Sequence, residues 1–236
     1  MSFQIAIDGP GGSGKSSVAR ELARRLGFLY IDTGAMYRAV ALNARNCGAD
    51  WQNEASVTAS LGGISIDLRH IGGAQALFLD NINVTDDLRT AEMGMGASAV
   101  SRYEAVRREL VRLQQKMAAG ANVVMDGRDI GTVVLPGADI KIYMDAAPEI
   151  RARRRCDELD NLGQSYDYKD ILEQIISRDL QDSTREISPL KVADGAVIID
   201  TGHMGFEEVV SELIDIVRAR RAIDNRLYGC DCNCCR

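Results

Sequence analysis

The feature that most constrains the fold of this chain is a glycine-rich segment, residues 9–16, with the sequence GPGGSGKS. An apolar run precedes it and a helical pattern follows it, which is the context that the phosphate-binding pattern G-x-x-x-x-G-K-[ST] requires. Its glycines allow successive backbone N–H groups to point at one anion, and the helix start adds a positive dipole end. Lys15 would then reach the β- and γ-phosphates of ATP, and Ser16 would offer its hydroxyl to Mg²⁺. The predicted ATP-binding residues are Gly9, Pro10, Gly11, Gly12, Ser13, Gly14, Lys15, Ser16 and Ser17.

The order of the predicted elements favours an α/β fold. Buried strands are predicted at residues 3–8, 29–31, 122–126, 140–144 and 196–200. Helices are predicted at residues 15–26, 36–46, 51–61 with Asp50 as N-cap, 87–100, from a Ser101–Glu104 capping box to Gly120, 149–159, 168–182 and 206–221. This alternation indicates a parallel sheet covered on both faces. Short alternating runs within residues 62–86 predict a small inserted antiparallel sheet.

Composition limits the class of protein. With 236 residues, 46% of them apolar, and no linker or repeat, the chain is predicted to form one domain over residues 1–221. No run approaches the roughly 20 apolar residues of a membrane span, and the N-terminus lacks a signal-peptide pattern. The net charge of −6 argues against nucleic acid as a partner. We therefore expect a cytoplasmic monomer with no membrane partner.

Four of the six cysteines crowd the C-terminus, at Cys230, Cys232, Cys234 and Cys235. They could hold a metal ion, but their spacing makes it hard for one short peptide to wrap a tetrahedral site. Residues 222–236 also lack the apolar periodicity that would dock them on a core. We therefore expect an undocked tail.

The remaining motifs favour a small kinase over other phosphate-binding classes. A base-reading N-K-x-D segment of GTPases is absent, and the chain is too short for the second domain of a motor ATPase. Asp126 ends an apolar strand, where an acid assisting Mg²⁺ is expected. A turn-initiating role is the alternative for Asp126. Twenty-three of the 28 basic residues are arginine, which grips planar oxyanions with two donors.

Several segments in order resemble the bacterial cytidylate kinase family. They are residues 7–10 (IDGP), 32–38 (DTGAMYR), 126–134 (DGRDIGTVV), 151–155 (RARRR) and 178–190 (RDLQDSTREISPL). The resemblance extends from residue 3 to about residue 220, and the tail matches nothing in the family. It implies a P-loop kinase with a five-stranded parallel sheet, an inserted three-stranded sheet near the acceptor site, and a mobile helical lid at residues 149–167.

The resemblance also implies an activity and a set of site residues. The expected reaction transfers the γ-phosphate of ATP to CMP or dCMP with Mg²⁺, held by Ser16 and Asp126. The implied CMP-binding residues are Arg38, Arg128 and Arg185 on the phosphate, Ser98, Arg107 and Asp129 on the base, Arg178 and Asp182 on the sugar, and Thr33. The implied catalytic residues are Lys15, Arg128 and the lid arginines Arg151, Arg154 and Arg155. Asp8, His70 and His203 receive no assigned role.

Two other functions remain open at this stage. One is a nucleoside monophosphate kinase for UMP or AMP, against which the long insert and the DGRD segment argue. The other is a non-catalytic nucleotide sensor with a metal-binding tail, against which the intact Lys15, Ser16 and lid arginines argue.

Overall fold

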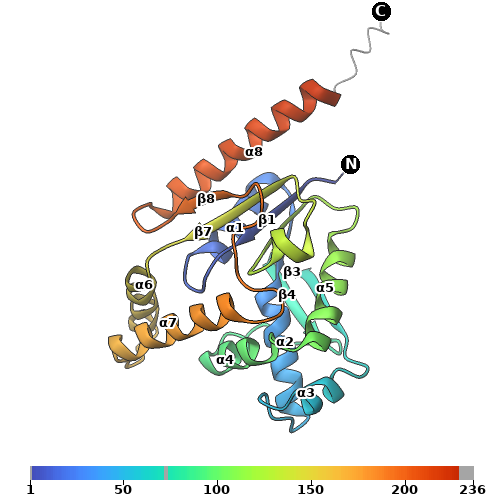
Figure 1. The fold of residues 1–236 in the computed structure, drawn as a ribbon, viewed down its shortest axis with the longest axis vertical. Coiled ribbons are helices and arrows are strands. Elements are labelled where there is room, and N and C mark those ends of the chain that lie inside the picture. Colours follow the sequence, from blue (N-terminus) through green and yellow to red (C-terminus); the bar gives the residue numbers. More distant parts are fainter. Residues whose placement is uncertain (1, 72–73, 229–236) are drawn as a thin grey trace, which may run out of the picture.

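A five-stranded parallel sheet forms the centre of the computed structural model, which describes residues 2–71 and 74–228 (Figure 1). The strand order is β2-β6-β1-β7-β8, and every neighbouring pair is parallel. The bounds are β1 (Gln4–Asp8), β2 (Leu29–Asp32), β6 (Val123–Gly127), β7 (Ile140–Asp145) and β8 (Val197–Asp200). The sequence-based prediction of a five-stranded parallel sheet is therefore confirmed.

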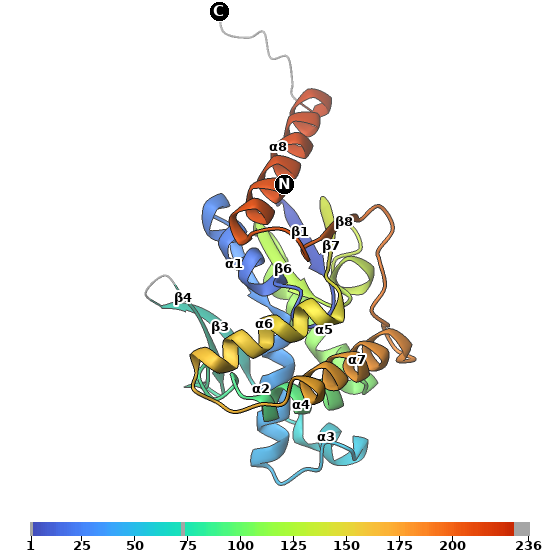
Figure 2. The same ribbon diagram turned by 90° about the vertical axis from the view of Figure 1, so that its left-hand side faces the viewer.

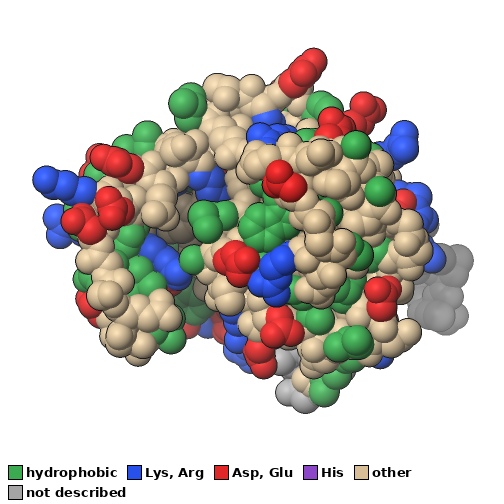
Figure 3. All heavy atoms as spheres, turned by 90° about the horizontal axis from the view of Figure 1, so that it is seen from below, with side chains coloured by type: hydrophobic (Ala, Val, Ile, Leu, Met, Phe, Trp, Pro, Cys, Tyr) green, Lys and Arg blue, Asp and Glu red, His purple; other side chains and the backbone are tan. Residues whose placement is uncertain are grey.

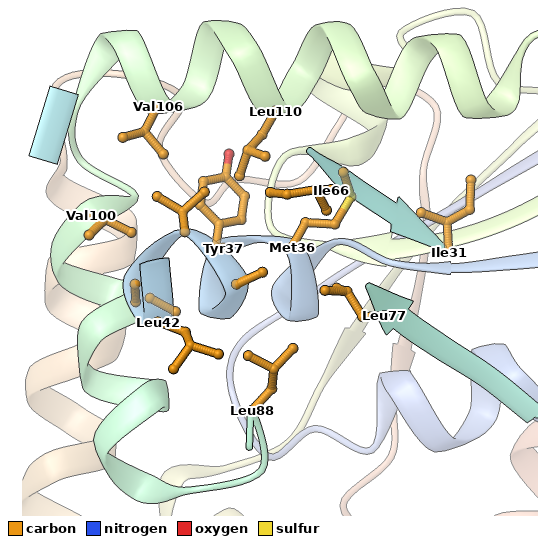
Figure 4. Close-up of a cluster of buried hydrophobic side chains, with 14 of the residues drawn as sticks. Ile31, Met36, Tyr37, Leu42, Ile66, Leu77, Leu88, Val100, Val106 and Leu110 are labelled. Carbon is orange, nitrogen blue, oxygen red and sulfur yellow. The ribbon is translucent and has the colours of Figure 1, made fainter. Parts of the chain in front are cut away.

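Helices cover both faces of this sheet, and the alternation of side chains along β1 shows how. Ile5 and Ile7 pack with α1 (Lys15–Leu26) and α8 (Phe206–Tyr228), whereas Ala6 packs into a second core on the opposite face. That second core is built from α2 (Thr33–Asn46), α4 (Ala91–Val100) and α5 (Glu104–Ala118). Figure 4 shows Met36 and Tyr37 of α2 at its centre, with Val106 and Leu110 of α5 beside them.

The inserted sheet packs on this second core. It consists of β3 (Ile66–Ile71), β4 (Ala74–Leu79) and β5 (Ile82–Asn83), paired antiparallel. Asp80 and Asn81 turn the β4–β5 hairpin with positive φ angles of 49° and 65°, as a tight turn of this kind requires. Ile66 and Leu77 point into the core beside α2 (Figure 4). The predicted three-stranded insert is thus confirmed.

Two further helices form an arm at the carboxyl edge of the parallel strands. They are α6 (Pro148–Asn161) and α7 (Tyr168–Thr184), which lie against each other below the sheet (Figures 1 and 2). The predicted lid, residues 149–167, covers most of α6 and the connection to α7. Among the described residues, no helix is both long and apolar enough to cross a membrane.

Several predicted helix starts are wrong, because the expected side chains do not cap the first backbone N–H groups. Asn53, not Asp50, caps α3 (Glu54–Ser60), accepting from the N–H of Ser56 at 3.0 Å. The α4 helix begins at Ala91 under a Thr90 cap, later than predicted. The Ser101 capping box does not form either, since the Ser101 hydroxyl donates to the carbonyl of Ser98 at 2.9 Å.

The C-terminal helix is longer than predicted, because α8 runs on to Tyr228 instead of ending at residue 221. Near this end the Arg221 guanidinium lies over the rings of Phe3 and Phe28, 5.0 and 4.9 Å from their centroids. The four clustered cysteines, residues 230–235, lie outside the described residues. The prediction of an undocked tail therefore stays a prediction.

Candidate functional site

The glycine-rich loop connects the carboxyl end of β1 to α1 at the edge of the sheet where β6 and β7 also end. A Cβ atom on Gly9 would lie 2.1 Å from the carbonyl oxygen of Met144, so only glycine fits there. Gly12 and Gly14 have φ angles of +79° and +86°, which bend the loop around its centre. Lys15 begins α1 inside this bend, 6% exposed, with Nζ donating to the carbonyl of Pro10 at 2.9 Å.

Lys15 is a buried cation on which other cations and carboxylates both act. Burial, followed by the nearby Arg128, lowers the pKa of Lys15 to about 7. A polyphosphate in the loop would favour the charged form of Lys15, because it adds negative charge beside the ammonium group. The loop and its lysine therefore have the geometry and the electrostatics of an anion site.

Asp126 lies on β6, directly across from Ser16 of α1. One carboxylate oxygen accepts from the Ser16 hydroxyl at 2.6 Å, and the other accepts from the Tyr30 hydroxyl at 2.8 Å. Burial, followed by repulsion from Asp32, raises the pKa of Asp126. A hydroxyl and a carboxylate are hard oxygen donors that suit Mg²⁺, which takes few protein ligands when phosphates supply the others. The residues present therefore fit a phosphate-bound magnesium ion.

A pocket of about 210 Å³ opens beside the loop, and all nine predicted CMP-binding residues line it. They come from five parts of the fold: the start of α2, the end of α4, α5, the segment after β6, and the C-terminal part of α7 with the residue after it. In that order they are Thr33 and Arg38; Ser98; Arg107; Arg128 and Asp129; Arg178, Asp182 and Arg185. A larger cleft containing Lys15, Ser16 and the lid arginines adjoins it. Seen from below, the molecule is hollowed, with Lys and Arg side chains in the hollow (Figure 3).

The pocket holds more buried cationic donors than acceptors. Asp129 pairs with Arg107, and both side chains are almost fully buried. Asp182 accepts from Arg128 Nε at 2.8 Å and lies 3.8 Å from Arg185. Within the described ranges, the buried donors without an acceptor include Arg38 Nε, Arg107 Nε, Arg178 Nε and Arg185 Nη2. Buried polar atoms ordinarily have partners, so these N–H groups indicate an anionic ligand.

The position of Arg178 shows how crowded the cations are. Its Nη1 and the Nη2 of Arg128 lie 3.7 and 3.4 Å from where a Cβ on Gly11 would be. Burial, followed by the charge of Arg128, lowers the pKa of Arg178 to about 10. Two guanidinium groups therefore face the phosphate loop at the junction of the two hollows.

The three lid arginines have different environments. Arg151 is buried and donates to the carbonyls of Ala146 at 2.8 Å and Gly11 at 3.0 Å, besides pairing with Asp179. Arg154 donates to the backbone and hydroxyl oxygens of Thr201. Arg155 is half-buried and pairs with Glu158 at 2.8 Å. In this conformation Arg151 is committed to the loop backbone, whereas Arg155 is held only by a surface pair.

Sequence reasoning missed four residues that complete the site: Asp8, Tyr30, Asp179 and Thr201. Tyr30 reads as an ordinary core residue because it sits in an apolar strand, and nothing in the sequence shows that its hydroxyl reaches Asp126. Thr201, which accepts from Arg154 and donates to the carbonyl of Ser13 at 2.9 Å, follows the last strand without a motif. Asp179 gave a usable signal, because it adjoins Arg178 in the RDLQD segment.

Comparisons with known proteins agree on one family. The family profile described as cytidylate kinase matches residues 5–219. A cytidylate kinase of Pelotomaculum thermopropionicum is 48% identical over 218 residues, covering 92% of this chain and 96% of its own. One from Bacillus pumilus is 46% identical over 213 residues, covering 90% and 95%.

Among solved structures, an uncharacterized protein from Eubacterium ventriosum aligns with a TM-score of 0.51 at 12% identity, covering 92% of this chain and 99% of that one. This likeness concerns the fold alone. Identity above 40% across nine-tenths of the chain, together with the family profile, establishes that the chain belongs to the cytidylate kinase family.

Proposed function

We propose that this chain transfers the γ-phosphate of ATP to CMP or dCMP, giving ADP and CDP or dCDP. The observation that carries the proposal is the pocket beside the phosphate loop, which combines unpaired donors of Arg38, Arg178 and Arg185 with a buried Arg107–Asp129 pair. The arginines suit a phosphate monoester, and the pair suits a base with an amino donor and a ring acceptor. Membership of the cytidylate kinase family does not favour the two alternatives, a kinase for UMP or AMP and a non-catalytic sensor.

The chemistry needs positioning and charge neutralisation more than proton transfer. The acceptor oxygen of CMP is already ionised at neutral pH, so it attacks the γ-phosphorus without a general base. The bond from that phosphorus to the β–γ bridging oxygen breaks, and the leaving ADP takes up the charge. Lys15 would follow this charge, and Arg38, Arg128 and Arg185 would hold the acceptor phosphate close to the γ-phosphate against their repulsion.

Magnesium, when bound, would neutralise the negative charge that develops on the phosphates during transfer. Ser16 and Asp126 are the residues we propose to hold it, directly or through water. Arg154 and Arg155 are proposed to approach the transferring phosphoryl group when the lid, residues 149–167, closes. Arg151 is proposed to act there too, and its present contacts also brace the loop at Gly11.

Base recognition is assigned to Asp129, Arg107 and Ser98. A carboxylate facing the amino group at carbon 4 and a cation facing nitrogen 3 match cytosine, whereas uracil presents the opposite donor and acceptor at these positions. Arg178 and Asp182 are proposed to hold the sugar, and Thr33 lines the pocket beside the acceptor phosphate. A cytoplasmic location and a monomeric state remain predictions.

A coupled assay of ADP release across CMP, dCMP, UMP, AMP and GMP tests the proposal. CMP and dCMP should be used with a kcat/KM at least tenfold above that of the other three. Omission of Mg²⁺ should abolish the reaction. A preference for UMP or AMP, or ADP release that does not depend on any acceptor, would contradict it.

A further inference from the structure

Asp8 is a buried carboxylate that the proposed reaction does not use. It is the last residue of β1, directly before the phosphate loop, and it is 2% exposed. Its two oxygens accept hydrogen bonds from the backbone N–H groups of Ile130 at 2.7 Å and Gly131 at 2.8 Å. These two residues begin η1 (Ile130–Val134), a π-helical turn that follows the DGRD segment. Asp8 therefore caps a turn that lies more than 120 residues away in the sequence.

The residue in the cap position of that turn has a different contact. An aspartate before a helical turn ordinarily caps it with its own side chain. Asp129 occupies this position but makes no side-chain cap bond, and only its carbonyl serves the turn, accepting from Val133 at 2.9 Å. Its carboxylate instead pairs with Arg107 at the pocket. Since Asp8 satisfies the first N–H groups of η1, Asp129 is free to face the pocket.

The packing around this segment leaves little room for η1 to shift. A Cβ on Gly131 would lie 3.1 Å from the Cβ of Ala193 and 3.3 Å from Asp8 Oδ2. A Cβ on Gly127 would lie 2.6 Å from the Thr33 hydroxyl. The segment from Gly127 to Gly131 is thus held closely at both ends. Loss of one anchor should displace the residues between them.

We propose that Asp8 is a positioning residue for base recognition: by capping η1 from the end of β1, it directs the Asp129 carboxylate into the acceptor pocket. This inference rests on the proposed role of Asp129 in reading cytosine. It links the donor loop to the base-reading residue through one side chain. A displacement at Asp8 is therefore expected to alter discrimination between bases, and not only stability.

The test is the substitution Asp8→Asn. Asparagine keeps one acceptor oxygen, but its NH₂ group faces the second backbone N–H. The cap therefore loses one of its two hydrogen bonds. The matched control is Asp139→Asn, because Asp139 also accepts a distant backbone N–H from β1, that of Gln4 at 2.7 Å, at the opposite end of the strand. For each variant, kcat/KM is measured with CMP and with UMP. The ratio of the two does not depend on how much of the sample is folded.

We expect Asp8→Asn to narrow the CMP:UMP ratio at least fivefold, and Asp139→Asn to change it less than twofold. The double variant of Asp8→Asn and Asp129→Ala should discriminate no less than Asp129→Ala alone, since both changes act through one carboxylate. If Asp8→Asn yields no folded protein, Asp8→Glu, which keeps the charge but alters its reach, decides by the same ratio.

The outcomes separate this inference from the proposed function. If Asp129→Ala narrows the ratio but Asp8→Asn leaves it unchanged, or if their effects multiply independently, the positioning role is overturned and base reading by Asp129 stands. If Asp129→Ala leaves the ratio unchanged, both assignments fail together. The use of CMP by the unmodified enzyme tests the activity itself, apart from either residue.

Discussion

Replacing Asp129 by alanine probes the most specific part of the proposed function. The carboxylate faces the pocket and forms a buried pair with Arg107. In our assignment it accepts from the amino group of cytosine, and it repels the oxygen that uracil carries at the same place. Its removal should therefore harm CMP much more than UMP.

Two magnitudes follow from the structure. Asp129 is 4% exposed and Arg107 is 3% exposed, so removing the carboxylate leaves a buried guanidinium without its counter-ion. Such a change costs about 3–5 kcal/mol. Arg107 keeps the Ser101 carbonyl at 2.9 Å, which places the loss near the lower end. For a chain of this size, about 3 kcal/mol corresponds to a fall in Tm of about 6–12 °C.

The effect on catalysis is separate from this stability loss. A site that hydrogen-bonds a substrate group discriminates strongly, because the wrong substrate leaves polar groups unpaired. We expect kcat/KM for CMP to fall about 10²-fold while that for UMP changes much less, narrowing the preference by about 2–3 kcal/mol. Both substrates are measured on the same preparation by coupled ADP release, well below the lowered Tm.

The refuting result is a parallel fall. If Asp129 only orients the neighbouring Arg128, both substrates lose a phosphate contact equally and the CMP:UMP ratio stays constant. That outcome would remove Asp129 from the base-reading residues, whatever happened to the Tm.

Four further expectations concern Lys15, the C-terminal tail, Arg221 and Asp8. Lys15→Ala should lower kcat about 10²-fold or more at saturating ATP and CMP, and unchanged turnover in the coupled assay would contradict the role of the loop. A chain ending at Arg221 should keep its CMP-dependent activity and its Tm by calorimetry, and a large loss of either would show that the tail packs on the core. Arg221→Ala should lower the free energy of unfolding by about 0.5–1 kcal/mol in denaturant unfolding, since it removes the cation over two partly buried rings. Burial raises the pKa of Asp8 from an ordinary 3.8 to about 6. Between these two values the folded state keeps a proton on Asp8 that the unfolded state has released. The protonated carboxyl therefore contributes stability that is present below about pH 4 and is lost as the pH rises through 6. The Tm difference between Asp8→Asn and the unmodified protein should therefore change between about pH 4 and pH 6, and a Tm difference that stays constant over this pH range would contradict the raised pKa of Asp8.

Much of the fold was predictable because its signals are local. The strand from Gln4 to Asp8 and the helix from Lys15 to Leu26 are marked by an apolar run, a glycine loop and an amphipathic repeat that lie next to each other. The hairpin at Asp80 and Asn81 carries its own turn residues. Helix starts were less predictable, because several residues compete for each first turn. At Ser101 the hydroxyl bonds backward to Ser98, and α5 begins without a side-chain cap.

The site was predictable where its residues form motifs and unpredictable where tertiary contacts create it. Seven of the nine pocket residues lie in the segments 32–38, 126–134 and 178–190, and the fold brings them to one edge of the sheet. Ser98 and Arg107 lie outside these segments, on helices that the fold places at the pocket. Asp8 also lies in a motif, but its partners are backbone N–H groups of a distant turn, and backbone groups leave no mark on a sequence. The Tyr30 hydroxyl has the same limitation, since only the pairing of β2 with β6 places it at Asp126.

The acidic balance of the whole chain hides a locally cationic site, and this contrast has an energetic consequence. A net charge of −6 coexists with Arg128 and Arg178 facing one loop, where burial, followed by the charge of Arg128, lowers the pKa of Arg178 and of Lys15. Desolvated cations that repel each other destabilise the fold until an anion joins them. Two phosphate-bearing substrates supply that anionic charge, so part of their binding energy goes into relieving a repulsion already present in the protein. The crowded cations therefore match the transition state best, in which both substrates are bound and charge moves between them. A phosphoryl-transfer enzyme needs its cations in this state.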